Sequence, residues 1–157
     1  MKTIILLVIE WSCVIYETTA CDPGWMQHGD SCYFVEIHNH KHWFGAKRWC
    51  ESQNGYLAAI ANYDENEFLK TQLRRLAPTV HIWLGGTDIA AEHNWVWAYT
   101  WEPFGFSDWN TGEPNNAGGQ EDCLTYLVGL YLWNDLWCGS ELAYICEKPL
   151  HPGLLIG

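Results

Sequence analysis

The sequence is poor in basic residues, in long apolar runs and in the short motifs of catalysis. Its 157 residues hold 8 Lys and Arg against 19 Asp and Glu, a formal net charge of −11. Nucleic acids and anionic membranes attract basic surfaces, so this balance argues against both as partners. No apolar run reaches the roughly 20 residues that a membrane-spanning helix needs, and membrane insertion is not expected. The H-E-x-x-H, G-x-S-x-G and C-x-x-C spacings are also missing, which argues against the commonest metalloprotease, hydrolase and thiol-redox classes.

The first 20 residues have the pattern of a secretory signal peptide. Lys2 precedes an apolar run over residues 3–9, and small residues lead to Ala20. This order of a basic, an apolar and a small-residue region is typical of a cleaved signal. A membrane anchor is the alternative, but the run is too short to span a bilayer. We therefore expect a secreted, extracellular product, with a signal peptide at 1–20, one domain at 21–148 and a short C-terminal tail at 149–157.

The mature chain keeps six of the seven cysteines. An even number in a secreted chain predicts disulfides. Spacing alone does not choose among the 15 pairings that six cysteines allow. The six are Cys21, Cys32, Cys50, Cys123, Cys138 and Cys146.

Periodicity divides the domain into a helical half and a half of short strands. After a predicted strand at 32–37, apolar spacing predicts helices at 43–53 and from Asp64, taken as the N-cap, to the residues before Pro78. Aromatic and β-branched pieces predict strands at 81–84, 95–98, 124–127, 131–133 and 143–147. The class is therefore α+β. Residues 99–120 form a connection too long to be idle, which indicates a functional loop.

Oxygen-bearing side chains gather in this loop and just beyond it. They are Glu113 and Asn115 on either side of Pro114, then Glu121-Asp122, and Asn134-Asp135 across a short strand. Carboxylates and amide carbonyls are the hard ligands that calcium takes six to eight at a time. A cis bond before Pro114 points Glu113 and Asn115 towards one ion, and Asn134 and Asp135 reach it if they lie at a strand end. A lone Glu-Pro-Asn triplet is more often an ordinary turn, but the whole set predicts a calcium site.

In this combination the sequence resembles the C-type lectin domain family over essentially all of the mature chain, and within it the secreted perlucin-like lectins of molluscs. The matching pieces are the cysteine order, Trp83-Leu84-Gly85-Gly86, Trp95, Trp97, Glu113-Pro114-Asn115, Glu121-Asp122-Cys123 and Trp133-Asn134-Asp135. The resemblance implies the C-type lectin fold, with two helices flanking short antiparallel sheets and a long calcium-binding loop. It also implies three disulfides, Cys21–Cys32, Cys50–Cys146 and Cys123–Cys138.

The resemblance further implies two calcium sites. The sugar-binding site comprises Glu113, Asn115, Glu121, Asn134 and Asp135. A second site comprises Asp88, Glu92, Glu121 and Asp122, with Asn116 where the family's best binders have an aspartate. That replacement removes one formal charge from the second site.

The acid and amide pattern implies mannose-type specificity. Neighbouring equatorial hydroxyls of mannose, glucose, N-acetylglucosamine or fucose would bind the ion while Glu113 and Glu121 accept, and Asn115 and Asn134 donate, hydrogen bonds. The family's galactose binders carry Gln-Pro-Asp, and galactose or mixed specificity is an alternative. We expect a pattern-recognition lectin for microbial glycans, in several copies or as a homo-oligomer because single open sites bind weakly. A biomineral or matrix role of the perlucin type is the other alternative.

An enzymatic role is not expected, because carboxylates that face one calcium stay ionised and cannot donate the proton that glycoside cleavage needs. His38, His40 and His42 alternate and would share one face of a strand, but no acid or cysteine nearby completes a metal site. Trp101 and Trp109 lie in the long loop, where packing is favoured over stacking on a sugar.

Overall fold

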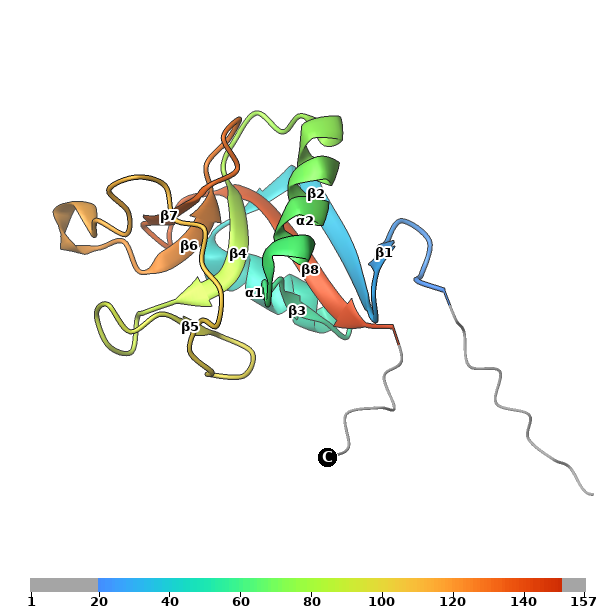
Figure 1. Ribbon diagram of the computed structural model, residues 1–157, viewed down its shortest axis with the longest axis horizontal. Coiled ribbons are helices and arrows are strands. Elements are labelled where there is room, and N and C mark those ends of the chain that lie inside the picture. Colours follow the sequence, from blue (N-terminus) through green and yellow to red (C-terminus); the bar gives the residue numbers. More distant parts are fainter. Residues whose placement is uncertain (1–19, 151–157) are drawn as a thin grey trace, which may run out of the picture.

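The computed structural model describes residues 20–150, so that all but the last residue of the predicted signal peptide, and residues 151–157 of the predicted tail, lie outside the described part. The helices are α1 (Trp43–Ser52), α2 (Tyr63–Leu76) and the short 3-10 helix η1 (Ala117–Gly119). The strands are β1 (Met26–His28), β2 (Ser31–Lys41), β3 (Tyr56–Leu57), β4 (Ile82–Thr87), β5 (Val96–Trp97), β6 (Cys123–Tyr126), β7 (Trp133–Leu136) and β8 (Leu142–Pro149) (Figure 1). Within residues 20–150, neither helix has the length and apolar character needed to cross a membrane.

All eight strands belong to one twisted sheet. Its order is β1-β2-β8-β4-β6-β7, with β3 added to β8 and β5 to β4. The α+β class is confirmed. The prediction of antiparallel sheets is wrong for one pair of strands. β4 and β8 run parallel, with Ile82 opposite Ala143. A parallel pair requires a long crossover, and here the chain leaves β4, builds the loop and the β6–β7 hairpin, and only then returns to β8.

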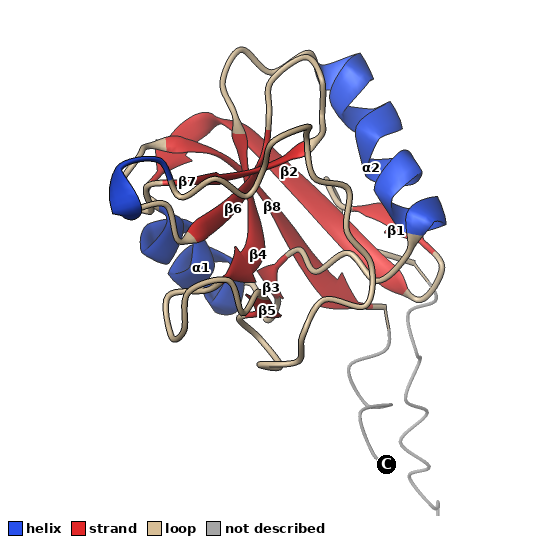
Figure 2. Cartoon of the chain, turned by 60° about the vertical axis from the view of Figure 1, so that its left-hand side comes forward, coloured by secondary structure: helices blue, strands red, loops and turns tan. Residues whose placement is uncertain are grey.

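The central strands β4, β6 and β8 are buried on both faces, because their alternating side chains enter two apolar clusters, one on each side of the sheet. In β8, Ala143 and Ile145 join the cluster that contains the apolar residues of α2, whereas Tyr144 and Cys146 join the cluster that contains those of α1. The two helices therefore cover opposite faces of the sheet (Figure 2). The strand over residues 143–147 is confirmed, and it continues to Pro149, with Leu150 also buried.

The residues just outside α2 determine where the helix begins and ends. The side chain of Asn62 accepts a hydrogen bond from Glu65 N at 3.0 Å and caps the helix. The prediction that Asp64 is the N-cap is wrong, since Asp64 is exposed in the first turn. Its charge still lies at the positive end of the helix dipole. At the other end the helix stops before Pro78, as predicted, through Ala77 at a left-handed φ of 46°.

The three disulfides pair as the sequence resemblance implied. Cys50–Cys146 joins α1 to β8, and Cys21–Cys32 ties the N-terminal segment to β2. Cys123–Cys138 joins β6 to the residues after β7, with the two Cα atoms 5.2 Å apart. This last disulfide clamps the two strands from which the candidate site is built.

A buried carboxylate lies on β8, at the position where β2 and β3 pair with this strand. Glu147 is 6% exposed. Its oxygens accept hydrogen bonds from Ser31 Oγ at 2.8 Å, Tyr56 OH at 3.1 Å and Ala59 N at 3.1 Å. Burial and the nearby charge of Glu65 outweigh these bonds and raise the pKa of Glu147 from 4.5 to about 7.

We predict that Glu147→Gln flattens the pH dependence of stability. A carboxyl group whose folded pKa is raised stabilises the fold in its protonated form. Wild-type stability therefore falls between pH 4.5 and 7, where the unfolded chain gives up this proton while the folded protein still holds it. The size of the effect is about 3 kcal/mol, from about 1.4 kcal/mol for each pKa unit. Urea denaturation at a series of pH values measures it, with calcium held constant.

The control is Glu141→Gln, which changes an exposed glutamate just before β8. It should leave the wild-type slope intact, whereas Glu147→Gln should lose most of the slope. Parallel pH profiles for wild type and Glu147→Gln would show that this group does not titrate as the buried environment requires.

Candidate functional site

The long connection between β5 and β6 is held to the sheet by the first residue of β7. Trp133 is fully buried, and its backbone N–H donates to Asp108 O while its carbonyl accepts from Asn110 N, each at 2.8 Å. Three aromatic side chains of the loop pack edge-on against its ring, namely Phe104, Phe106 and Trp109. The first half of the loop is therefore packed against the core through these three partly buried side chains.

Asp108 fixes the same half of the loop to α2. Its carboxylate accepts from Asn66 Nδ2 at 2.7 Å and forms an ion pair with Lys70. Neither contact is apparent from the sequence, because the partners lie 42 and 38 residues apart. The prediction that the loop tryptophans pack within the protein is confirmed for Trp109, which contacts Trp133. It is wrong for Trp101, whose side chain is 60% exposed.

Asp135 anchors the second half of the loop. Its carboxylate is 1% exposed and accepts from Asn115 N at 3.1 Å and from Asn116 N at 2.6 Å. The amide of the adjacent Asn134 donates to the Asp135 carbonyl. These contacts bring β7 against the Glu-Pro-Asn triplet, where the Glu113–Pro114 peptide bond is cis as predicted.

Asn134 and Asp135 lie inside β7 and not at a strand end. They pair with Thr125 and Leu124 of β6. The strand predicted at 131–133 is wrong in its bounds, since β7 begins only at Trp133. Tyr131 adopts a left-handed φ of 53° and prolongs the turn that follows β6. Both side chains still lie next to the Glu-Pro-Asn triplet. Asp135 accepts a hydrogen bond from the loop backbone, and the Asn134 amide donates to the Asp135 carbonyl.

Glu121, at the end of the loop, borders the site on its remaining side and binds two residues of the loop. Its Oε2 accepts from Ala117 N at 2.9 Å, and its backbone N–H donates to Asn116 Oδ1 at 3.0 Å. Asn116 also donates its amide to Glu92. It thereby connects the residues predicted for the sugar-binding ion with those predicted for a second ion.

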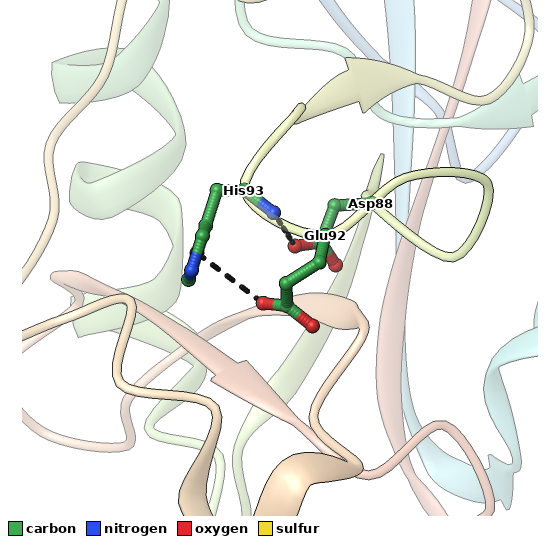
Figure 3. A group of neighbouring side chains, drawn as sticks. All are labelled: Asp88, Glu92 and His93. Atoms are coloured by element: carbon green, nitrogen blue, oxygen red, sulfur yellow. Dashed lines mark hydrogen bonds and ion pairs between the residues drawn. The ribbon is translucent and has the colours of Figure 1, made fainter.

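The second group comes from the turn after β4 (Figure 3). Asp88 is 3% exposed, and its Oδ2 accepts from His93 N at 2.9 Å. His93 Nδ1 lies 3.2 Å from Glu92 Oε1. One ligand atom from each of Asp88, Glu92 and His93 lies within 4.8 Å of the others. The sequence did not point to His93, which is held at a left-handed φ of 66°.

Asp122 lies beside this group without joining its cluster of ligand atoms. Its backbone carbonyl accepts from Thr87 Oγ1 at 2.6 Å and from Asp88 N at 3.3 Å. Burial raises the pKa of Asp88, and the charges of Glu92 and Asp122 raise it further.

The alternating histidines do not form a comparable group. His38 and His40 are exposed on β2, and His42 caps α1 by accepting from Gly45 N at 3.2 Å. His42 therefore has a structural role that the alternation did not predict.

Two carboxylate oxygens of the site are buried without a hydrogen-bond partner in residues 20–150. They are Glu113 Oε2 and Asp88 Oδ1. Burial raises the pKa of Glu113, as do its contact with Asp135 and the charge of Glu121. Burial and the charge of Asp135 also raise the pKa of Glu121. Such orphaned, mutually repelling oxygens are unfavourable in the protein alone, and they fit a hard cation such as Ca²⁺, whose preferred ligands are carboxylate and amide oxygens.

Comparisons with known proteins identify the family of the chain. The family described as Lectin C-type domain matches residues 39–148. Perlucin of Haliotis laevigata is 34% identical over 134 residues, 84% of this chain and 85% of that protein. The C-type lectin mannose-binding isoform of Oxyuranus scutellatus is 31% identical over 152 residues, 94% of this chain and 95% of that protein. The carbohydrate-recognition domain of cow CD23, crystallised in the presence of GlcNAc2Man3 oligosaccharide, is similar with a TM-score of 0.75 and 33% identity, over 83% of this chain and 96% of that one.

The bridging role of Asn116 leads to a prediction for Asn116→Asp. The variant loses the amide donor to Glu92 and gains a carboxylate beside Glu92 and Glu121. Without calcium it should be less stable by about 1–3 kcal/mol. Calcium offered to the group around Asp88 and Glu92 should bind on the order of tenfold more tightly, because ligand charge sets calcium affinity.

Thermal denaturation in chelator and in calcium, together with calorimetric titration of calcium, measures both effects. Asn94→Asp is the matched control, since it adds the same charge at an exposed position of the neighbouring turn. An Asn116→Asp protein with the stability and calcium stoichiometry of this control would contradict the bridging role.

Proposed function

The chain belongs to the C-type lectin domain family, and from this we propose that it is a calcium-dependent lectin for mannose-type sugars. The residues that we propose to hold the sugar-binding calcium are Glu113, Asn115, Glu121, Asn134 and Asp135. The observation that carries the proposal is the buried Oε2 of Glu113, which has no hydrogen-bond partner in the described part of the chain and lies beside Asp135 and Glu121. The family is one of binding domains, so the chain is not an enzyme, in agreement with the sequence-based prediction.

A bound calcium ion would supply coordination positions that two neighbouring hydroxyls of a sugar can fill. The protein contributes the surrounding hydrogen bonds. Glu113 and Glu121 are acceptors for the hydroxyl protons, and the amides of Asn115 and Asn134 are donors to the hydroxyl oxygens. Asp135 does not need to contact the sugar, because its bonds to the loop backbone orient Asn115.

Mannose-type specificity is supported by the Glu-Pro-Asn order of acid and amide. It is also supported by two relatives, since one is named as mannose-binding and the other was solved in the presence of an oligosaccharide that contains mannose. Glycans with mannose, glucose, N-acetylglucosamine or fucose termini, as on microbial surfaces, are the partners that we propose. Several copies of the domain would raise the avidity of such weak sites by roughly 10² to 10⁴.

We further propose a second calcium at Asp88, Glu92, Asn116 and Asp122. The buried Oδ1 of Asp88, which no described residue bonds, supports this second site. Secretion is likewise part of the proposal. Three disulfides support it, because such bonds persist in oxidising compartments.

We predict that the wild-type protein is retained on immobilised mannose in calcium and released by EDTA or by free mannose, but not by free galactose. The matched variant is Glu113→Gln with Asn115→Asp, which exchanges acid and amide while keeping the oxygen ligands. It should still need calcium, yet lose at least about tenfold in mannose affinity, or about 1.4 kcal/mol, and gain affinity for galactose. Retention that EDTA leaves undiminished, or wild-type elution by galactose ahead of mannose, would overturn the proposal.

We also predict that acid releases both calcium and sugar. Protons compete with calcium for the carboxylates. Because the pKa values of Glu113 and Glu121 are raised above 4.5, affinity should begin to fall at a higher pH than for ordinary carboxyl groups. Calorimetry in two buffers of different ionisation enthalpy measures the protons released as calcium binds. A calcium affinity that is independent of pH, with no proton release, would contradict this prediction.

A further inference from the structure

A groove beside the proposed calcium site is lined by apolar side chains that the fold leaves exposed. Phe44, Ile89 and Trp137 are 41%, 49% and 57% exposed. They line a groove of about 440 Å³, a volume within the usual range for small-ligand pockets. Exposed apolar patches of this kind on a folded domain commonly mark binding surfaces.

Trp137 is exposed but fixed in place. Leu136, before it, pairs with Cys123 in the sheet, and Cys138, after it, forms the disulfide to Cys123. The Cys138 carbonyl also accepts from Trp43 N at 3.0 Å. The indole ring lies directly against Gly139, where an added Cβ would be 2.4 Å from Trp137 Cζ2. A ring already held this way loses little conformational entropy when a ligand covers it.

Polar residues of mixed character complete the groove. They are His42, Gln120 and Asp122, and Asp122, which we also propose as a ligand of the second calcium, can offer its other carboxylate oxygen to a sugar hydroxyl. Since His42 Nδ1 accepts from Gly45 N, the neutral ring carries its proton on Nε2 and can donate. An amide, an imidazole donor and a carboxylate around an aromatic ring suit a pyranose, which has an apolar C–H face and a rim of hydroxyls. An acyl chain or an apolar peptide would leave these polar groups unpaired at a cost.

Two stretches of the chain contribute residues both to the groove and to the proposed sugar site. Gln120 and Asp122 flank Glu121, which is one of the proposed ligands. Trp137 follows Asp135 by two residues along an extended chain, so their Cα atoms lie about 7 Å apart. A glycan whose terminal sugar occupies the calcium site can therefore reach the groove with its next residues.

We propose that this groove is an extended subsite in which Trp137 stacks on an inner sugar of an oligosaccharide. The inference rests on the proposed function and makes it more specific, because the ligand becomes an oligosaccharide and not only its terminal residue. Trp137 and Gly139 then determine the preference for longer glycans, while the calcium ligands determine which terminal sugar binds.

The test compares methyl α-mannoside with a linear mannotriose by isothermal titration calorimetry in calcium. Wild-type protein should bind mannotriose more tightly. Trp137→Ala should lose roughly three- to tenfold in mannotriose affinity, the size of an aromatic stacking contribution, and bind methyl α-mannoside as wild type does. Gly139→Ala retains the indole but displaces it, and should give the same pattern. The control is Tyr63→Ala, which removes a 64% exposed aromatic at the start of α2 and should change neither affinity.

The outcomes separate this inference from the proposed function. If wild-type protein fails to bind methyl α-mannoside in calcium, the proposed function is wrong. If it binds the two ligands equally, or if Trp137→Ala leaves mannotriose affinity unchanged, only the subsite is wrong. Equal losses for both ligands would show that Trp137 supports the primary site, and would also overturn the subsite. The alternative occupant of the groove is a second copy of the chain, and sedimentation velocity detects it. If wild-type protein forms dimers that Trp137→Ala loses, and mannotriose affinity does not change, the groove is a contact between two copies and the subsite is wrong.

Discussion

The buried carboxylate of Asp135 is the contact on which the geometry of the site depends. It belongs to β7, which β6 and the Cys123–Cys138 disulfide hold in place, and it accepts hydrogen bonds from two successive backbone N–H groups of the loop. Hydrogen bonds to an ionised acceptor are among the stronger ones in proteins, and their loss would leave a charge buried and unpaired. The loop is thus positioned through its backbone, which leaves the side chains of Glu113 and Asn115 available for a ligand.

The features that could be predicted from sequence are those with local causes. The apolar spacing that predicts α1 lies within that helix. The end of α2 follows from the proline that comes just after it. Pro114 makes a cis bond plausible because the tertiary amide reduces the preference for trans. Disulfide pairing is different in kind. Spacing left all pairings open, and the resemblance to a family supplied the correct one, because Cys50 and Cys146 meet only after the whole sheet has formed.

The features that could not be predicted are set by contacts between distant residues. β7 begins two residues later than its apolar pattern suggests because Tyr131 donates its backbone N–H to Leu127 O and its hydroxyl to Leu73 O. These contacts favour a turn over a strand. His93 belongs to the second group because a left-handed turn brings it back to Asp88. Such conformations cost about 1–3 kcal/mol each and persist only where the surrounding structure imposes them, and no periodicity in the sequence signals them.

The two halves of the long loop are stabilised in different ways, and this difference connects stability to binding. The half before Glu113 is packed into the aromatic core around Trp133. The half after it turns through Gly118 and Gly119 at positive φ, exposed to solvent, and is held by polar contacts of Asn116 and Glu121. The carboxylates gather in this second half, where their repulsion weakens the protein alone. A cation that neutralises them would therefore stabilise the polar half while leaving the aromatic half unchanged, so that ion binding and local folding become one equilibrium.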